Sequence, residues 1–174
     1  MSSVAKIVSG GQTGADRGGL DAAIALGVPH GGWCPKGRRA EDGEIPACYA
    51  LVETASSNYL VRTEQNVVVS HATVVFTFGK PSGGSKKTID LAVRHQRPCL
   101  CLDLAAMDDE EAALAVLQWL SPGGLLMEGV PVPPPNPVLN VAGSRESKAP
   151  GIQDRVRAVM KLVLRPPFYV PQAE

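Results

Sequence analysis

Three glycine- and hydroxyl-rich segments have the composition of anion-binding loops. The first, residues 9–17, places glycines, hydroxyl groups and an arginine directly after a short apolar run. Residues 79–88 and 142–148 follow apolar runs in the same way. Glycines let the backbone approach a ligand closely, and the N-terminus of a following helix presents unpaired N–H groups that favour negative charge. The pattern predicts a site for a phosphate or another oxyanion.

The candidate ligand-binding residues come from these loops and from a basic segment near residue 36. Cations there can pair with an anion, while hydroxyl and N–H groups can donate hydrogen bonds to it. Arg39, Lys87 and Lys148 are expected on a solvated surface instead. The candidates are Gly10, Gly11, Gln12, Thr13, Gly14, Arg17, Lys36, Arg38, Ser82, Gly83, Gly84, Ser85, Thr88, Gly143, Ser144 and Arg145.

Three carboxylates near the loops are candidates for catalysis, namely Asp16, Asp90 and Glu146. A carboxylate beside a sugar carbon stabilises the positive charge that develops when a glycosidic bond breaks. Asp16 has an equally good alternative role as a plain negative charge at a helix N-terminus. No spacing selects a nucleophile with its base or a metal cage, and Cys99 and Cys101 are expected to be small apolar residues on one strand face.

Neither glycine loop is diagnostic alone. The run from Gly10 to Gly14 is not the GxGxxG dinucleotide fingerprint, and residues 79–86 lack the spacing of an ATP-hydrolysing P-loop. Each loop could be a tight strand-to-helix turn and no more, but two in one chain favour ligand binding. Replacing Gly11 or Gly84 by valine is therefore expected to abolish binding and to leave the fold intact.

Apolar runs alternate with helical patterns along the chain. Strands are expected at residues 4–8, 73–78, 99–104 and 138–141, and residues 31–46 are expected to form a long loop. Residues 58–66 suit a helix, whereas the following Val67–Val69 is β-branched. The alternation predicts an α/β fold, a three-layer domain over residues 1–174 with a mainly parallel central sheet, in which the proline-rich residues 131–137 are a surface connection. Loops at the carboxyl ends of parallel strands then converge on one crevice.

Composition narrows the class of protein. The 174 residues carry 17 Lys plus Arg against 17 Asp plus Glu, so the balance lacks the positive charge typical of proteins that bind nucleic acid or anionic membranes. We expect no membrane or extended nucleic-acid partner. The N-terminal residues do not resemble a signal peptide and no apolar run could span a bilayer, which predicts a cytoplasmic protein with free thiols.

Five blocks of the sequence resemble a known family. Residues 6–17, 30–43 and 140–152 are similar to signature blocks of the putative molybdenum carrier family, and residues 62–67 and 77–85 also match. The resemblance implies membership of a circularly permuted YpsA-type branch of the SLOG superfamily. That superfamily has a Rossmann-like fold and includes the Lonely guy nucleotide-processing enzymes and the DNA-processing protein DprA.

The resemblance implies a small phosphorylated metabolite or a nucleotide as ligand, and a homodimer or higher homo-oligomer. Lonely guy enzymes hydrolyse the N-glycosidic bond of a nucleotide with a Gly-Gly-x-Gly-Thr loop followed by glutamates. Here Gly83-Gly84 is followed by Ser-Lys-Lys-Thr, one residue longer and without the third glycine, and Asp90 stands where a glutamate is expected. The alternative is a carrier that holds molybdate or the molybdenum cofactor as a bound ligand without catalysis.

Overall fold

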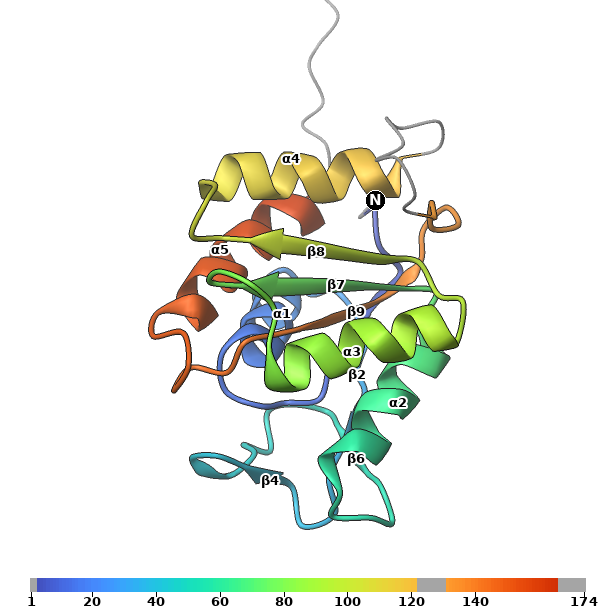
Figure 1. Cartoon of the computed structure of the whole chain (residues 1–174), viewed down its shortest axis with the longest axis vertical. Helices are drawn as coiled ribbons and strands as arrows, with labels where there is room; N and C mark the ends of the chain where they lie inside the picture. The colour runs from blue at the N-terminus through green and yellow to red at the C-terminus, as the bar shows by residue number, and fades with distance from the viewer. Residues whose placement is uncertain (1–2, 122–130, 166–174) are drawn as a thin grey trace, which may run out of the picture.

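The computed structural model describes residues 3–121 and 131–165 of the chain (Figure 1). The strands are β1 (Lys6–Val8), β2 (His30–Gly31), β3 (Trp33–Cys34), β4 (Arg39–Ala40), β5 (Gly43–Glu44), β6 (Val52–Glu53), β7 (Ala72–Thr77), β8 (Cys99–Asp103) and β9 (Val138–Gly143). The helices are α1 (Ala15–Ala25), α2 (Tyr59–Val69), α3 (Gly83–Arg94), α4 (Asp109–Leu120) and α5 (Ile152–Leu164).

Five parallel strands form the central sheet in the order β2-β1-β9-β7-β8. Chain order and spatial order differ because β9, the last strand, is inserted between β1 and β7. The chain therefore continues from β1 to β2 at one edge of the sheet, and from β7 to β8 at the other edge. The α/β class and the parallel sheet predicted from the alternating pattern are confirmed.

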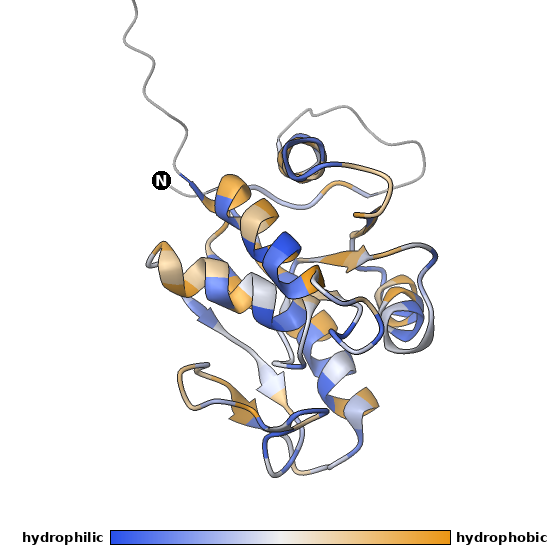
Figure 2. Ribbon diagram, turned by 90° about the vertical axis from the view of Figure 1, so that its left-hand side faces the viewer, coloured by the Kyte–Doolittle hydropathy of each residue, from blue (hydrophilic) through white to orange (hydrophobic). Residues whose placement is uncertain are grey.

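Helices cover both faces of this sheet. Helix α1 packs on β1 and β9 and against α5, which in turn contacts α4, whereas α3 packs on β7, β8 and β9 and lies beside α2 (Figure 1). All six residues of β7 are buried, as a strand covered on both faces requires. Figure 2 shows hydrophobic and hydrophilic residues alternating along the helices, whose apolar sides form the core with the sheet.

The predicted helix boundaries are partly corrected by tertiary packing. Helix α2 runs through the β-branched residues to Val69, because Val67 is fully buried there and its packing outweighs the weak strand preference of valine. Helix α4 begins with a capping box formed by Asp108 and Glu111. Gly27 adopts a φ of +65° just after α1, the left-handed conformation that favours glycine at the end of a helix.

The segment predicted as a long loop is more ordered than expected. Strand β3 pairs in parallel with β6, and β4 and β5 form an antiparallel hairpin, called here the β4–β5 hairpin (residues 39–44), whose turn is completed by Gly43 at φ +118°. Two-residue strands are too short to give a periodic hydrophobic signal. The sequence therefore could not predict them.

Two further expectations concern the surface. Strand β8 lies at the edge of the sheet, and Cys101 on it is exposed rather than part of an apolar face. Residues 131–137 contain no helix or strand and are mostly exposed. Within the described ranges, none of the helices has the length and apolar character needed to cross a bilayer.

Candidate functional site

A cavity of about 240 Å³ lies between the loop from β7 to α3 and the loop from β9 to α5. These are adjacent strands whose following helices cover opposite faces of the sheet, so the cavity lies where open α/β sheets generally bind ligands. We call it the anion cavity, after the oxyanion site that the sequence predicts. It is lined by Ser82, Gly83, Gly84, Ser85, Ser144, Arg145 and Lys148.

The N-terminus of α3 forms one wall of the anion cavity. A Cβ atom added at Gly83 or at Gly84 would meet nothing within 4 Å, so the backbone of this first turn is accessible. The carbonyl of Ser82 already accepts from the N–H of Ser85, whereas the N–H groups of Gly83 and Gly84 precede the first intrahelical bond. Two backbone donors at the positive end of the helix dipole therefore belong to residues that line the cavity.

Two cations form the opposite wall. Arg145 and Lys148 come from the loop after β9, which is held to the sheet by a 3.0 Å hydrogen bond from the N–H of Ser144 to the carbonyl of Phe76. The Arg145 side chain is 42% exposed and Lys148 is exposed, so both can turn toward a ligand. Lys148 was expected only on a solvated surface, and its position on the cavity wall is visible only in the fold.

The first glycine loop lies directly behind this wall, but its glycines are covered by the protein itself. A Cβ atom on Gly14 would lie 2.4 Å from the carbonyl oxygen of Ser144, and the N–H of Ala15 donates to that oxygen at 3.0 Å. A Cβ atom on Gly10 would fall within the guanidinium group of Arg62. The loops therefore converge as predicted, but only the second and third line the cavity.

The expectation that valine at Gly11 leaves the fold intact is wrong. It has a φ of +75°, and a Cβ atom there would lie 2.5 Å from Cδ1 of Leu51 and 3.1 Å from Ile45. A valine at this position must strain the backbone and displace core side chains, so the fold would not stay intact. Gly84 has neither obstacle and remains a clean test of the site.

Asp16 is engaged in a buried ion pair. Its carboxylate lies 2.8 Å from Nη1 of Arg62 and accepts a 3.2 Å hydrogen bond from the N–H of Gln12. The two charged side chains are only 8% and 12% exposed. Gly10 leaves the space through which the Arg62 guanidinium reaches this carboxylate, which accounts for a glycine here without any ligand.

The candidate residues Arg17 and Arg38 also make their hydrogen bonds to other parts of the protein. Arg17 makes two hydrogen bonds to Asp42, at 2.6 and 2.8 Å, and donates to the carbonyl of Gly11. The Arg17 hydrogen bonds hold the pKa of the Asp42 carboxyl below its ordinary value. Arg38 donates to four backbone carbonyls and so fixes the loop that contains them, and Lys36 is exposed on the same segment.

The remaining candidate carboxylates differ in their surroundings. Glu146 accepts hydrogen bonds from the N–H groups of Gly151 and Gln153 and so caps α5. Asp90 is 61% exposed and forms an i,i+4 ion pair with Lys86. Of the other candidates, Thr88 is buried with its hydroxyl bonded to the Gly84 carbonyl, and Gly143 is packed so tightly that a Cβ atom would lie 2.0 Å from the carbonyl oxygen of Phe76.

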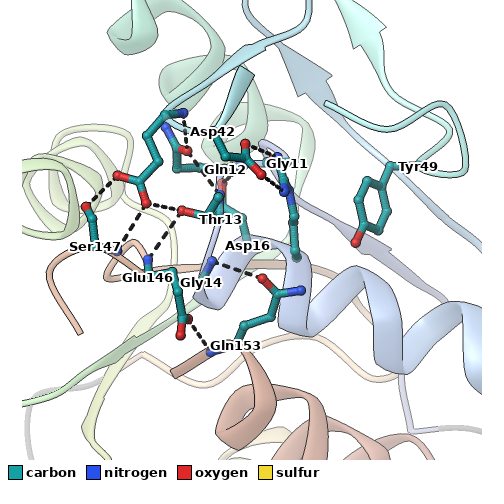
Figure 3. Close-up of polar contacts among 12 residues, drawn as sticks. Gly11, Gln12, Thr13, Gly14, Asp16, Asp42, Tyr49, Glu146, Ser147 and Gln153 are labelled. Carbon is teal, nitrogen blue, oxygen red and sulfur yellow. Dashed lines mark hydrogen bonds and ion pairs between the residues drawn. The ribbon is translucent and has the colours of Figure 1, made fainter. Parts of the chain in front are cut away.

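One carboxylate near the cavity, Glu41, escaped the sequence reasoning. It lies at the turn of the β4–β5 hairpin, and its carboxylate accepts hydrogen bonds from the Thr13 hydroxyl and from both the N–H and hydroxyl of Ser147. Figure 3 shows Thr13, Glu146 and Ser147 gathered at this point. The sequence signal was its place in the block that resembles the family, because its contacts join residues that are 28 positions apart, for Thr13, and 106 positions apart, for Ser147.

The electrostatics around Glu41 keep it charged. Partial burial raises the pKa of its carboxyl, but the hydrogen bonds from Ser147 and Thr13 and the charge of Arg145 outweigh burial and lower the pKa below the ordinary value. By contrast, burial raises the pKa of the Cys99 thiol to about 12. Among the described residues, no three His, Cys, Asp or Glu side chains are grouped closely enough to hold a metal ion.

Comparison with known proteins identifies the family. A model described as the circularly permutated YpsA SLOG family matches residues 7–164. The chain belongs to this family. A crystal structure at 1.45 Å resolution, described as a putative molybdenum carrier protein from Syntrophus aciditrophicus, is 38% identical and superposes with a TM-score of 0.80, covering 94% of this chain and 97% of that one. No curated protein matches the sequence.

Proposed function

We propose that this member of the circularly permuted YpsA SLOG family binds a nucleotide or a related phosphorylated ligand in the anion cavity. The observation that carries the proposal is the open first turn of α3, at Gly83 and Gly84, facing Arg145 and Lys148. Backbone N–H groups and a helix dipole on one side with two cations on the other are the elements of a phosphate site.

The cavity volume indicates which part of the ligand is enclosed. Pockets that bury a whole drug-sized ligand range from about 300 to 1,000 Å³, and the anion cavity measures about 240 Å³. It suits a phosphate and the atoms attached to it. A base or other large group would extend over the surface beyond the cavity.

The arrangement supports binding better than turnover. Hydrolysis of an N-glycosidic bond, the enzymatic form of this proposal, needs a carboxylate next to the anomeric carbon. Asp16 is paired with Arg62, Glu146 caps α5 and Asp90 forms a surface ion pair, so each of the candidate carboxylates has another partner. We infer that the primary property of the cavity is to hold a phosphorylated ligand.

Carriage of molybdate or of the molybdenum cofactor is a second candidate, favoured by the description of the related crystal structure. The cavity fits the oxyanion part of either ligand, because its donors are N–H, hydroxyl, guanidinium and ammonium groups. Gly83, Gly84, Arg145 and Lys148 would hold molybdate, or the phosphate of the cofactor, through oxygen atoms. The cofactor when bound would supply the molybdenum chemistry.

Calorimetric titration of the wild type and of Gly84→Val with adenosine 5′-monophosphate, inorganic phosphate and molybdate tests the site. The added side chain should block the approach of an anion to the α3 backbone and weaken binding by at least about tenfold, since direct hydrogen bonds to a charged group are lost. Thermal unfolding of the same variant should be close to that of the wild type, because the added Cβ meets no protein atom.

Two lysine variants provide a matched comparison. Lys148→Ala removes a cation from the cavity wall and should weaken binding by roughly threefold to fivefold, whereas Lys87→Ala removes an exposed cation outside the cavity and should leave binding unchanged. Tighter binding of the nucleotide than of molybdate favours the first candidate, and the reverse order favours the carrier. Unaltered affinity in both Gly84→Val and Lys148→Ala would place the ligand elsewhere.

A further inference from the structure

Glu41 lies close to the anion cavity without being one of its lining residues. Its Oε2 atom is 3.7 Å from Nη1 of Arg145, which does line the cavity. The two side chains form an ion pair at this distance, but the atoms are too far apart for a hydrogen bond. The guanidinium N–H groups therefore remain available to a ligand, while the negative charge of Glu41 acts on whatever Arg145 binds.

The carboxylate of Glu41 cannot swing away from this position without breaking several bonds. The Ser147 N–H donates to it at 3.1 Å, the Ser147 hydroxyl at 2.5 Å, and the Thr13 hydroxyl also donates to it. The backbone N–H of Glu41 itself donates to Oε1 of Gln12 at 2.9 Å. Its side chain is only 19% exposed, so water screens the charge less than it would at a free surface.

We propose that Glu41 is a specificity-determining residue of the anion site, whose fixed negative charge beside Arg145 disfavours the more highly charged anions. The inference rests on the proposed function, because it assumes that the cavity binds an oxyanion. Two side-chain cations line the cavity, and Glu41 offsets part of their charge. The repulsion grows with ligand charge, so an anion that carries more negative charge loses more affinity.

The proposal assigns Glu41 a role that differs from simply fastening the loops together. A residue that only held the Ser147 loop in place would contribute equally to the affinity for every anion. A charge-selecting residue changes the ratio of two affinities. Glu41→Gln separates the roles, because a glutamine of the same size can still accept from Thr13 and Ser147 through its carbonyl oxygen but carries no charge.

The test is calorimetric titration with inorganic phosphate and with pyrophosphate at low ionic strength. Glu41→Gln should bind pyrophosphate about threefold to tenfold more tightly than the wild type, with a smaller gain for phosphate, as expected for screened charges several ångströms apart. The gain should largely disappear in high salt. Glu44→Gln is the matched control, because it removes an exposed carboxylate from the same β4–β5 hairpin and should change neither affinity.

Each outcome decides the inference, and the proposed function is judged separately. An unchanged pyrophosphate-to-phosphate ratio in Glu41→Gln, with wild-type binding intact, overturns the selective role of Glu41 and leaves the anion site standing. Absence of binding in both proteins overturns both proposals. Should Glu41→Gln be less stable than the wild type, both proteins are titrated in a stabilising osmolyte, and the pyrophosphate-to-phosphate ratio remains the readout, because partial loosening of the loop lowers both affinities and only loss of the charge changes their ratio.

Discussion

The buried ion pair between Asp16 and Arg62 allows a quantitative prediction about a residue that the sequence offered as catalytic. Asp16→Asn removes one charge and leaves the Arg62 guanidinium, 12% exposed, without its counter-ion at 2.8 Å. Breaking a buried pair on one side costs about 3 to 5 kcal/mol. Asparagine can still accept from the Gln12 N–H, so we expect the lower end, about 3 kcal/mol of unfolding free energy.

The assay is urea unfolding followed by far-ultraviolet circular dichroism, with thermal unfolding in parallel. For a chain of this length about 3 kcal/mol corresponds to a fall in Tm of roughly 6 to 12 °C. Asp90→Asn is the control, since that carboxylate belongs to an exposed i,i+4 pair with Lys86 and should change stability by less than about 0.5 kcal/mol.

A double-mutant cycle completes the experiment. Combining Asp16→Asn with Arg62→Met removes both charges, and the double variant should be more stable than the sum of the two single losses predicts. A loss below about 1 kcal/mol in Asp16→Asn, with no coupling to Arg62, would refute the reasoning. Asp16 would then be available for chemistry at the loop, as the sequence alone allowed.

Three further predictions concern acid stability, thiol reactivity and a buried tyrosine. The folded-state pKa values of the Glu41 and Asp42 carboxyls lie below their ordinary values of about 4, so the unfolded chain binds more protons in acid. The stability that these two carboxylates contribute is complete above about pH 5 and is lost as the pH falls through their folded-state pKa values. In urea unfolding, Glu41→Gln and Asp42→Asn should thus lose less stability than the wild type between pH 7 and pH 3, and an equal loss would contradict this. Exposed Cys48 should react with a thiol reagent at pH 8 at least about tenfold faster than Cys99, whose burial raises its pKa to about 12; peptide mapping of the labelled protein measures both rates. Tyr49→Phe should lower the unfolding free energy by roughly 1 to 2 kcal/mol, because the Tyr49 hydroxyl donates a 2.7 Å hydrogen bond to the Asp21 carboxylate; a neutral result in urea unfolding would show that the bond is replaced by water.

The fold could be predicted because each long element has a local signal. Strand β7 is a continuous run of β-branched and apolar residues, and the strand-to-helix alternation implies parallel pairing. The position of β9 between β1 and β7 has no such signal, since it depends on packing between segments more than 60 residues apart. The short strands β3 to β6 were missed because two residues cannot express a period.

The candidate site was predicted in outline and not in detail. Loop composition correctly indicated Gly83 and Gly84 at a helix N-terminus, but it could not distinguish them from Gly10 and Gly11, which make room for Arg62 and Leu51. Glycine serves ligand approach and tight internal packing through the same absence of a side chain. Only the neighbours that the fold brings to each glycine tell these two uses apart.

The first glycine loop already holds a negative charge of its own. The carboxylate of Asp16 accepts from the N–H of Gln12 and faces the guanidinium of Arg62, which is how an oxyanion is held at such a loop. Because this anion is tethered to the chain, it competes at an effective concentration that a free phosphate does not reach. One glycine loop is thus occupied from within by its own carboxylate, and among the described residues the glycine loop at the start of α3 is the one whose backbone stays open to a ligand.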